Sequence, residues 1–324
     1  MRESILAKAA RAAVRVCLKP ALRPAFSCAI QRRWADAATR TLSVPFGVRF
    51  SRRSLVGVPT EVARRKADAG EATSAVLFLH GGAFIIGSPR SHRSITGRLA
   101  RLTGANVFVP DYRLAPEHPF PAALDDVIAC YRALLNEGYA PERIAVAGDS
   151  AGGGLALSLC LRLRFERLPQ PACVALISPW ADLTLTRLAP IANDALLRPA
   201  WLAQGAAAYL QGRSAEDPLI SPLAADLTGL PPIMIESGSE EILRDDSRRL
   251  ADALNASDVQ VVHMEFPRMW HDFQLYAGIV PEATLAIEEL GRFIRGEFAL
   301  IGQHRQPTNG AGTAIRAIAA GRAM

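Results

Sequence analysis

The sequence predicts an α/β fold, with a mostly parallel sheet covered by helices on both faces. Short, wholly apolar segments alternate with longer segments of helical periodicity along most of the 324 residues. Apolar runs of this length fit strands that are buried on both faces, as in parallel sheets. Half of the residues are hydrophobic and 21% are charged, so a large core is available to one domain.

The first 44 residues predict amphipathic helices. Over residues 3–18 the apolar side chains form one helical stripe and the basic ones form another, and Pro20 ends the pattern. A second amphipathic piece covers residues 28–41. Neither helix is expected to be stable alone in water, so we expect both to lie as a lid over an apolar pocket.

Strands and helices then alternate along the chain. The expected strands are 48–56 and 60–65, paired through a turn at 57–59, and then 75–79, 106–109, 144–147, 173–177, 233–236 and 259–266. The expected helices are 94–103, 123–137, one after residue 150, 200–210, 247–255 and 283–295. A long excursion covers about residues 181–229, and the aperiodic residues 298–324 are expected to be a disordered tail.

Basic charge is concentrated in the N-terminal arm. The formal net charge of the chain is +6, but residues 1–66 alone hold 15 Lys and Arg against three acidic residues. Such an arm is either a solvated helix face or a patch that contacts an anionic surface. No nucleic-acid-binding motif accompanies it, so we expect no nucleic-acid partner.

The cysteines and the N-terminal residues give information about the cellular compartment of the protein. The five cysteines are widely spaced and form no Cys-x-x-Cys pair, which argues against a disulfide framework. Charges recur too often near the start for a secretory signal, although the Arg-rich start also resembles a mitochondrial transit peptide. No apolar run has the length of a membrane span. We expect a cytoplasmic protein without stable membrane insertion.

One stretch carries the strongest chemical signal, Gly148-Asp149-Ser150-Ala151-Gly152. It lies between an apolar run and a run of small residues and leucines, which fits a strand–turn–helix unit. Gly-x-Ser-x-Gly in this context is the nucleophile elbow, in which small neighbours leave the serine hydroxyl exposed at a sharp turn. Ser150 is the candidate nucleophile, and the amide of Ala151 is a candidate donor to an oxyanion.

A serine hydroxyl needs a base, and the base needs an acid that orients it. On this kind of sheet the chain order is serine, acid, histidine. His271 follows the last strand and is the candidate base. The acid is expected in the loop after strand 233–236, where spacing does not separate Glu240 from Glu241.

The loop after strand 75–79 reads His80-Gly81-Gly82-Ala83. Two successive glycines let backbone amides approach a substrate closely, because no Cβ intervenes. Gly81 and Gly82 are therefore candidate oxyanion donors beside the amide of Ala151.

Four motifs occur in order along the chain: His80-Gly81-Gly82, Asp111-Tyr112-Arg113-Leu114-Ala115-Pro116-Glu117, Gly148-Asp149-Ser150-Ala151-Gly152 and Ser178-Pro179-Trp180-Ala181-Asp182. Together they resemble the hormone-sensitive-lipase family of α/β-hydrolases. The resemblance implies a carboxylic ester hydrolase with an eight-stranded sheet and a helical cap. It implies a catalytic domain over 45–297, and a cap made of residues 1–44 and an insertion at about 181–229.

The resemblance also selects among the candidate residues. In this family the acid is the first residue of a stretch like Asp-x-Leu-x-Asp. Residues 241–245 match that stretch, so the resemblance implies Glu241 as the acid. Ala83 stands where many relatives have a third glycine, and it is expected to narrow the acyl or alcohol pocket. The stretch 111–117 is implied to brace the oxyanion loop. The mechanism requires no metal and no organic cofactor.

The expected function is that of a serine carboxylesterase, which hydrolyses short-chain esters through an acyl-enzyme. Hydrolysis of a lactone or an acetyl ester on the same triad and ligand binding without catalysis are the alternatives. The expected partner is a small ester, and a homodimer is left open. Activity is expected to rise with pH through about 6–7, as His271 becomes neutral.

Overall fold

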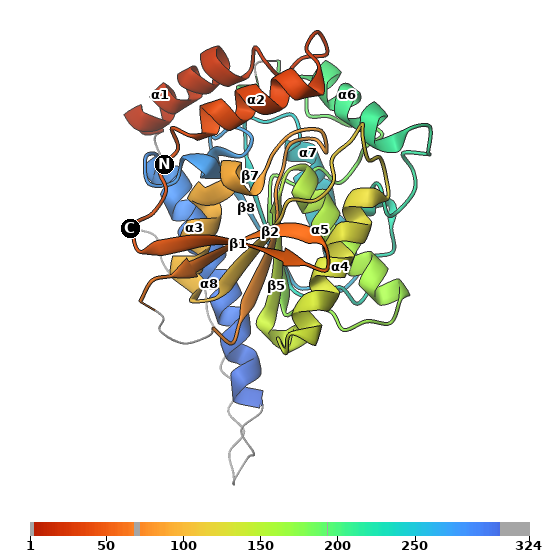
Figure 1. Cartoon of the computed structure of the whole chain (residues 1–324). Coiled ribbons are helices and arrows are strands. Elements are labelled where there is room, and N and C mark those ends of the chain that lie inside the picture. Colours follow the sequence, from red (N-terminus) through yellow and green to blue (C-terminus); the bar gives the residue numbers. More distant parts are fainter. Residues whose placement is uncertain (1–2, 68–71, 193, 305–324) are drawn as a thin grey trace.

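The computed structural model of the chain describes residues 3–67, 72–192 and 194–304 (Figure 1). The strands are β1 Val48–Leu55, β2 Val58–Arg65, β3 Ala75–Leu79, β4 Asn106–Pro110, β5 Ile144–Asp149, β6 Cys173–Ile177, β7 Ile233–Gly238 and β8 Val261–Phe266. The helices are α1 Ile5–Ala13, α2 Cys28–Thr39, α3 Arg93–Thr103, α4 Ala122–Asn136, α5 Ala151–Phe165, α6 Pro199–Leu210, α7 Arg244–Ala256 and α8 Pro281–His304. Short helical turns are η1 Val14–Leu18, η2 Pro89–His92, η3 Pro141–Arg143, η4 Pro222–Ala224 and η5 Phe273–Tyr276.

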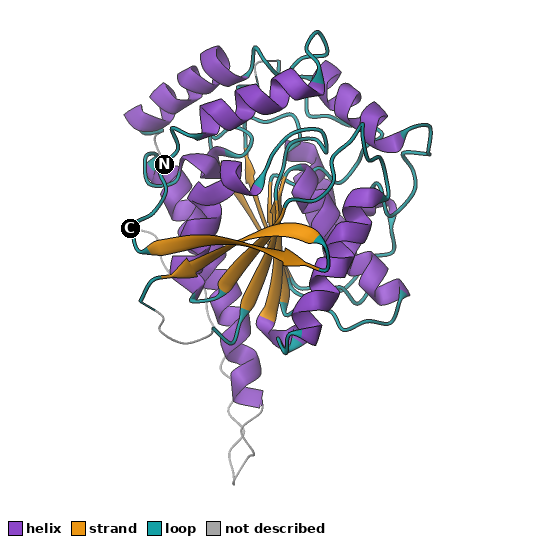
Figure 2. Cartoon of the chain, in the orientation of Figure 1, coloured by secondary structure: helices purple, strands orange, loops and turns teal. Residues whose placement is uncertain are grey.

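The eight strands form one sheet in the order β1-β2-β4-β3-β5-β6-β7-β8. β2 pairs antiparallel with both β1 and β4, and all other neighbours in the sheet run parallel. α3 and α8 pack on one face, and α4, α5 and α7 cover the other (Figure 2). The predicted mostly parallel, eight-stranded sheet with helices on both faces is confirmed.

The helix that follows β5 lies very close to the sheet. Gly152 of α5 sits where a Cβ atom would lie 2.0 Å from the carbonyl oxygen of Leu79 in β3, so only glycine fits there. Every residue of β3, β5 and β6 is buried. This packing lets β5 turn directly into α5, with one residue at the junction, at the edge where the parallel strands end.

The β1–β2 hairpin turns one residue earlier than the sequence predicts. Leu55 pairs with Val58, so the two-residue turn is Val56-Gly57 rather than residues 57–59. Both turn residues have positive φ, 48° and 87°, as in the type I′ turn that matches the twist of two antiparallel strands. The strong preference of valine for extended backbone concealed this turn in the sequence.

Three helices lie over the edge of the sheet at which the parallel strands end, namely α1, α2 and α6 (Figure 1). The start of α1 is fixed to α8, because Glu282 accepts hydrogen bonds from the amide and the hydroxyl of Ser4 at 2.7 and 2.8 Å. α2 is joined to α6 by Gln31, which accepts from the indole of Trp201 at 2.6 Å. The N-terminal helices and the helix of the long excursion therefore share one layer.

The last helix is longer than the sequence predicts. α8 continues to His304, whereas the periodicity predicts its end near Arg295 and a tail from residue 298. Residues 305–324, the greater part of that predicted tail, lie outside the described residues. None of the helices in the described ranges combines the length and the apolar character needed to cross a membrane.

The carboxyl group of Glu236 is buried within the sheet. Glu236 of β7 is fully buried, and its Oε2 accepts from the side-chain amide of Gln274 at 3.0 Å. Burial raises the pKa of Glu236 well above its usual 4.5, because the charged form loses its hydration. At pH values between the unfolded-state pKa and this raised pKa, the folded protein therefore holds a proton that the unfolded chain has released.

We expect Glu236→Gln to flatten the pH dependence of stability. Because the folded state binds the extra proton, wild-type stability falls as pH rises above the unfolded-state pKa, by up to about 1.4 kcal/mol per pH unit from this group. The amide keeps an oxygen for Gln274 and carries no titratable proton. Urea unfolding from about pH 5 to pH 8 measures this, and parallel curves for the two proteins would contradict it.

Candidate active site

Ser150 occupies a strained position at the junction of β5 and α5. Its backbone has φ 52° and ψ −121°, a conformation that costs of the order of 1–3 kcal/mol for a residue with a side chain. Its amide donates to the carbonyl of Ile177 at 2.8 Å, and its carbonyl accepts from the amides of Gly153, Gly154 and Trp180 at 2.9–3.1 Å. The turn is therefore locked on both sides, as the predicted nucleophile elbow requires.

The structure brings Glu241, and not Glu240, to the imidazole of His271. Oε2 of Glu241 lies 2.5 Å from Nδ1 of His271. Oε1 of the same carboxylate accepts from the hydroxyl of Ser178 and the amide of Gly238, both at 2.9 Å. Glu240 instead forms an ion pair with Arg11 of α1. Every oxygen of the Glu241 carboxylate is thus bonded, which fixes the ring of His271 at Nδ1.

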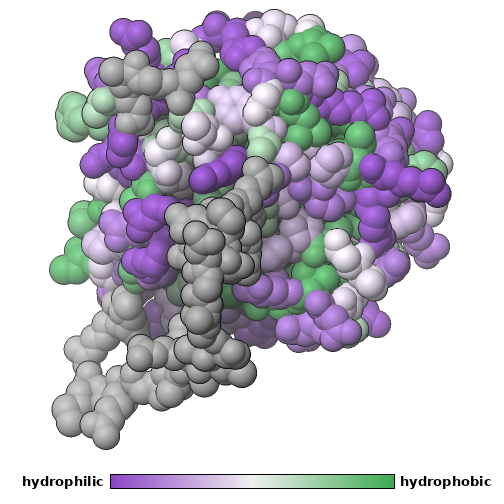
Figure 3. Space-filling view, turned by 90° about the horizontal axis from the view of Figure 1, so that it is seen from below, coloured by the Kyte–Doolittle hydropathy of each residue, from purple (hydrophilic) through white to green (hydrophobic). Residues whose placement is uncertain are grey.

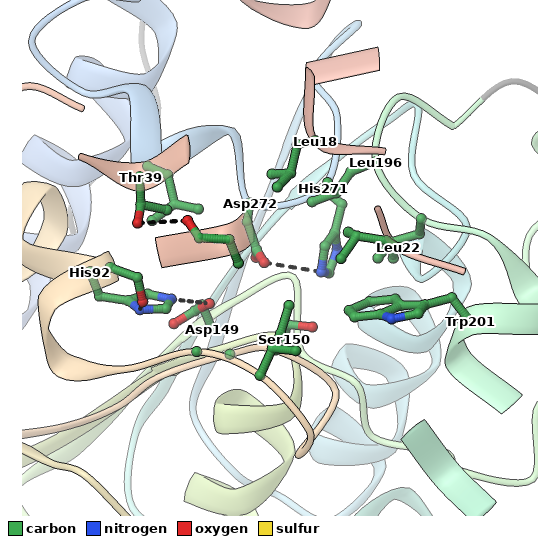
Figure 4. Close-up of a pocket in the computed structure, with 18 residues that line it drawn as sticks. Leu18, Leu22, Thr39, His92, Asp149, Ser150, Leu196, Trp201, His271 and Asp272 are labelled. Atoms are coloured by element: carbon green, nitrogen blue, oxygen red, sulfur yellow. Dashed lines mark hydrogen bonds and ion pairs between the residues drawn. The ribbon is translucent and has the colours of Figure 1, made fainter. Parts of the chain in front are cut away.

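A second carboxylate lies at the other ring nitrogen. Oδ2 of Asp272 is 3.1 Å from Nε2 of His271, and both side chains are buried (Figure 4). Asp272 follows β8 and has φ 55°, which lies in the left-handed backbone region that aspartate tolerates. Among the described contacts Ser150 forms no hydrogen bond with His271. Nε2 of His271 has an ion-pair contact with Asp272 but no hydrogen-bond partner among the described residues.

The two carboxylates set the charge of His271. Burial disfavours the imidazolium, but Asp272 and Glu241 outweigh burial, so the pKa of His271 lies well above its usual 6.5. Burial also raises the pKa of Asp272 to about 6, although the neighbouring imidazole opposes this. The sequence alone places the rise of activity at about pH 6–7. The structure moves this expectation to higher pH, because the neutral imidazole appears only above the raised pKa.

A buried polar pair supports the loop of the predicted oxyanion donors. Oδ2 of Asp149 lies 3.1 Å from Nε2 of His92. Burial alone would lower the pKa of His92, but the neighbouring Asp149 carboxylate outweighs burial and raises this pKa above its usual 6.5. A Cβ atom on Gly81 would lie 2.2 Å from the same Asp149 oxygen, so the loop rests directly on this carboxylate. Any residue larger than glycine at 81 would displace the loop or the carboxylate.

The amides predicted to hold an oxyanion are free to do so. Those of Gly81, Gly82 and Ala151 donate to no acceptor within the described part of the chain. The loop is braced by Tyr112, whose hydroxyl donates to the carbonyl of His80 at 2.5 Å and whose ring stacks on the imidazole at 4.3 Å. Burial lowers the pKa of His80 to about 4, so this support stays neutral near pH 7.

Ala83 does not narrow the cavity, contrary to the sequence-based expectation. It is buried with φ 52°, a backbone conformation that explains why a glycine suits this position. A Cβ atom added to Gly205 of α6 would lie 2.8 Å from the methyl group of Ala83. The methyl group thus faces α6, where a second glycine makes room for it, and Ala83 is not among the described residues that line the cavity.

Four of the candidate residues, Gly81, Gly82, Ser150 and His271, line a cavity of about 70 Å³ beneath α1, α2 and α6 (Figure 4). Its described lining is mostly apolar, and its polar groups lie at the base except for Thr39 of α2 in the roof. The lining residues are Leu18, Leu22, Ala35, Thr39, Gly81, Gly82, Ile86, Gly87, Ser91, His92, Asp149, Ser150, Leu196, Leu197, Trp201, His271, Asp272 and Leu275. Among the described residues no group of three His, Cys, Asp or Glu side chains is arranged to hold a metal ion. The cavity therefore combines a serine, an imidazole and an apolar wall.

Comparisons with known proteins identify the family of the chain. A family profile described as alpha/beta hydrolase fold matches residues 76–275. An acetyl-hydrolase of Streptomyces hygroscopicus is 44% identical over 223 residues, which are 68% of this chain and 75% of that protein. An esterase of Acinetobacter venetianus is 41% identical over 243 residues, 74% of this chain and 79% of its own.

A solved structure extends the match over almost the whole chain. A crystal structure of an esterase from the bacterial hormone-sensitive lipase family has a TM-score of 0.86 and 35% sequence identity, covering 92% of this chain and all of its own. The chain belongs to the hormone-sensitive-lipase family of α/β-hydrolases. The predicted family and the predicted class of enzyme, a carboxylic ester hydrolase, are confirmed.

Two buried aspartates that the sequence analysis does not single out lie beside the candidate residues, one at the loop of Glu241 and one at His271. Asp194 accepts from the amides of Leu196, Leu197 and Ile242, at 2.7–2.8 Å, and so ties the excursion to the residue after Glu241. Asp272, beside His271, is the second aspartate that the sequence analysis does not single out. Neither side chain belongs to a spaced motif, so only the folded chain reveals them.

We expect Glu241→Gln and Glu240→Gln to differ sharply. The amide at 241 cannot stabilise the imidazolium of His271, so kcat falls by about 10³- to 10⁴-fold. The same change at 240 removes only a partly exposed ion pair with Arg11 and changes kcat by less than about two-fold. Steady-state kinetics on p-nitrophenyl acetate with both variants decides this, and equal losses would contradict the geometry.

We expect Asp272→Asn to shift the pH profile to lower pH. The variant loses one of two carboxylates that keep the proton on His271, so the pKa of the imidazole falls and the neutral base forms earlier. The measurement is kcat/KM from about pH 5 to pH 9. Asp252→Asn, on the exposed side of α7, is the matched control. Profiles of wild type and Asp272→Asn that coincide would rule out this role.

Proposed function

We propose that the chain is a serine carboxylesterase that hydrolyses short-chain esters, acetyl esters included, through a covalent acyl-enzyme. The observation that carries the proposal is the locked turn of Ser150 at the base of an apolar cavity that His271 also lines. The Glu241 carboxylate at 2.5 Å from Nδ1 of His271 supports the role of this histidine as the base.

In the first half of the proposed reaction, Ser150 Oγ attacks the ester carbonyl carbon while Nε2 of His271 takes the hydroxyl proton. The carbonyl oxygen becomes an oxyanion, which the amides of Gly81, Gly82 and Ala151 stabilise. Each such donor contributes about 100- to 1,000-fold to turnover. When the carbon–oxygen bond to the alcohol breaks, the imidazolium returns its proton to the leaving alkoxide.

In the second half, water replaces the alcohol. His271 removes a proton from the water as it attacks the acyl-serine, and the same amides hold the second oxyanion. Collapse releases the carboxylic acid and returns the proton to Ser150. In both halves Nε2 of His271 must form a hydrogen bond with Ser150 Oγ, and the described contacts do not include this bond. Catalytic hydrogen bonds that are absent without ligand often form only in the substrate complex.

The size of the cavity supports short acyl groups. Its volume of about 70 Å³ compares with the 10–15 Å³ that one water molecule needs by the same kind of measure. The cavity therefore accommodates a few heavy atoms and no long chain without movement of α1, α2 or α6. We propose that this helical layer, from residues 1–44 and about 181–229, is the cap that limits acyl length.

We expect p-nitrophenyl acetate and butyrate to be hydrolysed with the highest kcat/KM, and the octanoate and palmitate progressively more slowly. Ser150→Ala should lower kcat by more than about a thousand-fold on every ester, because no nucleophile remains. A lactone panel beside the esters tests the alternative substrate class. Hydrolysis that survives in Ser150→Ala would remove the proposal, and a palmitate optimum would overturn the short-chain part.

The state of the cysteines supports a reducing compartment such as the cytoplasm. All five are free thiols, and Cys130, Cys160 and Cys173 are buried among apolar side chains. Burial raises the pKa of Cys130 and Cys160 to about 12, so these thiols stay protonated and unreactive. We propose that they serve as small core residues, as their apolar neighbours in the sequence predict.

A further inference from the structure

Large apolar side chains are exposed mainly at the N-terminal end of the chain. Of the twelve that the described residues expose, seven lie within the first 46 residues. Ile5 and Leu6 of α1 are 84% and 51% exposed, Val16 of η1 is 73% exposed, and Ile30 and Trp34 of α2 are 48% and 46% exposed. On the opposite side of the molecule, seen from below in Figure 3, hydrophobic residues are scattered among hydrophilic ones.

Unlike most surface helices, α1 and α2 bury small or polar side chains and expose large apolar ones. The side chains that α1 and α2 bury are Ala7, Ala10, Gln31 and Ala35, which are small or polar. A helix that only covers a globular core buries its large apolar residues and exposes its polar ones. Here the larger apolar residues point outward, which is typical of a surface that meets a second apolar phase or a partner.

The outer face of α2 adjoins η1, which continues directly from α1. The indole Nε1 of Trp34 in α2 donates to the carbonyl of Cys17 in η1 at 2.7 Å. This bond lays the indole beside the turn that also carries Val16. We call the outer side of α1, η1 and α2 the cap face; its apolar members are Ile5, Leu6, Val16, Ile30 and Trp34.

The cap face is positively charged. Residues 1–46 contain nine Lys and Arg and only two acidic residues. Both acids are occupied, since Glu3 pairs with Arg11 and Asp36 accepts from the hydroxyl of Ser88. Exposed basic side chains stand among the apolar ones: Lys8, Arg15, Arg33 and Arg40. A symmetric dimer through this face would bring like charges together, whereas an anionic surface would attract them.

The cap face is also the outer side of the cavity roof. Leu18, Leu22, Ala35 and Thr39, from η1, α2 and the segment that joins them, line the cavity above Ser150. A surface that binds the cap face would therefore lie next to the layer through which an ester reaches the site.

We propose that the cap face docks peripherally on an anionic lipid surface and lets the enzyme take esters that are dissolved in or exposed on that surface. Apolar side chains enter the boundary between head groups and acyl chains, while the basic ones meet lipid phosphates. The attachment is reversible, because no described helix is long and apolar enough to cross the bilayer. The surface does not depend on the proposed mechanism, and soluble esters remain substrates without it.

Sedimentation of the full chain with vesicles tests the proposal. We expect binding to vesicles of phosphatidylcholine with phosphatidylglycerol, little binding to phosphatidylcholine alone, and release by high salt. Binding that is equal for both compositions, or absent from both, would overturn the proposal. Hydrolysis of p-nitrophenyl acetate, measured in the same samples without vesicles, reports the proposed function separately.

Variants of the cap face identify the surface that binds. We expect Ile5→Glu with Val16→Glu to abolish sedimentation, and Lys8→Gln or Arg33→Gln to weaken partitioning by about five-fold each. The matched control is Phe165→Glu, at the end of α5, where an 83% exposed aromatic ring lies outside the cap face. Phe165→Glu should bind vesicles as wild type does. All variants should keep wild-type hydrolysis of soluble acetate, which shows that they fold.

A second copy of the chain is the competing occupant. Light scattering over a range of concentrations separates the two cases. If the wild type forms a dimer that Ile5→Glu with Val16→Glu dissociates, and vesicles do not compete with that dimer, the cap face is a subunit interface and the lipid proposal is wrong. A monomer that sediments with anionic vesicles supports it.

Discussion

The turn at Ser150 is the constraint on which the rest of the site depends. A residue with a side chain is held at φ 52° and ψ −121° by hydrogen bonds to Ile177 and from Trp180. The close packing of α5 on the sheet, which needs glycine at 152, offsets the strain of this turn. The same turn places the amide of Ala151 at the first position of the helix. The packing of α5 on β3 thus helps to orient both the hydroxyl of Ser150 and the amide that we propose as an oxyanion donor.

The parts of the site that follow from local chemistry could be read from the sequence. The backbone at a sharp turn requires the small residues around Ser150, and close approach of the backbone requires the glycines after β3. The chain order of a serine, an acid and a histidine indicates His271 after β8. The family resemblance then implied Glu241 over Glu240. Spacing alone could not choose between two adjacent glutamates, because the choice is made by distant partners: Ser178 holds one, and Arg11 of α1 holds the other.

What the sequence did not predict depends on contacts between segments far apart in the chain. Asp272 gains its importance only because the turn after β8 points its carboxylate at Nε2 of His271. Ala83 was expected in the pocket, but its methyl group faces Gly205, more than a hundred residues later. The start of the β1–β2 turn at Val56 was missed because valine rarely adopts positive φ. Each of these errors concerns the direction of a side chain or a backbone angle, not the presence of an element.

The central claim is that one serine, activated within the cavity, carries the reaction, and covalent labelling tests it most directly. Wild-type protein is treated with a fluorophosphonate, its intact mass is measured, and the modified peptide is sequenced. The account predicts one adduct per chain, located on Ser150, with ester hydrolysis lost in proportion to labelling. An active protein that takes up no label, or full inactivation by an adduct on another residue, would contradict it.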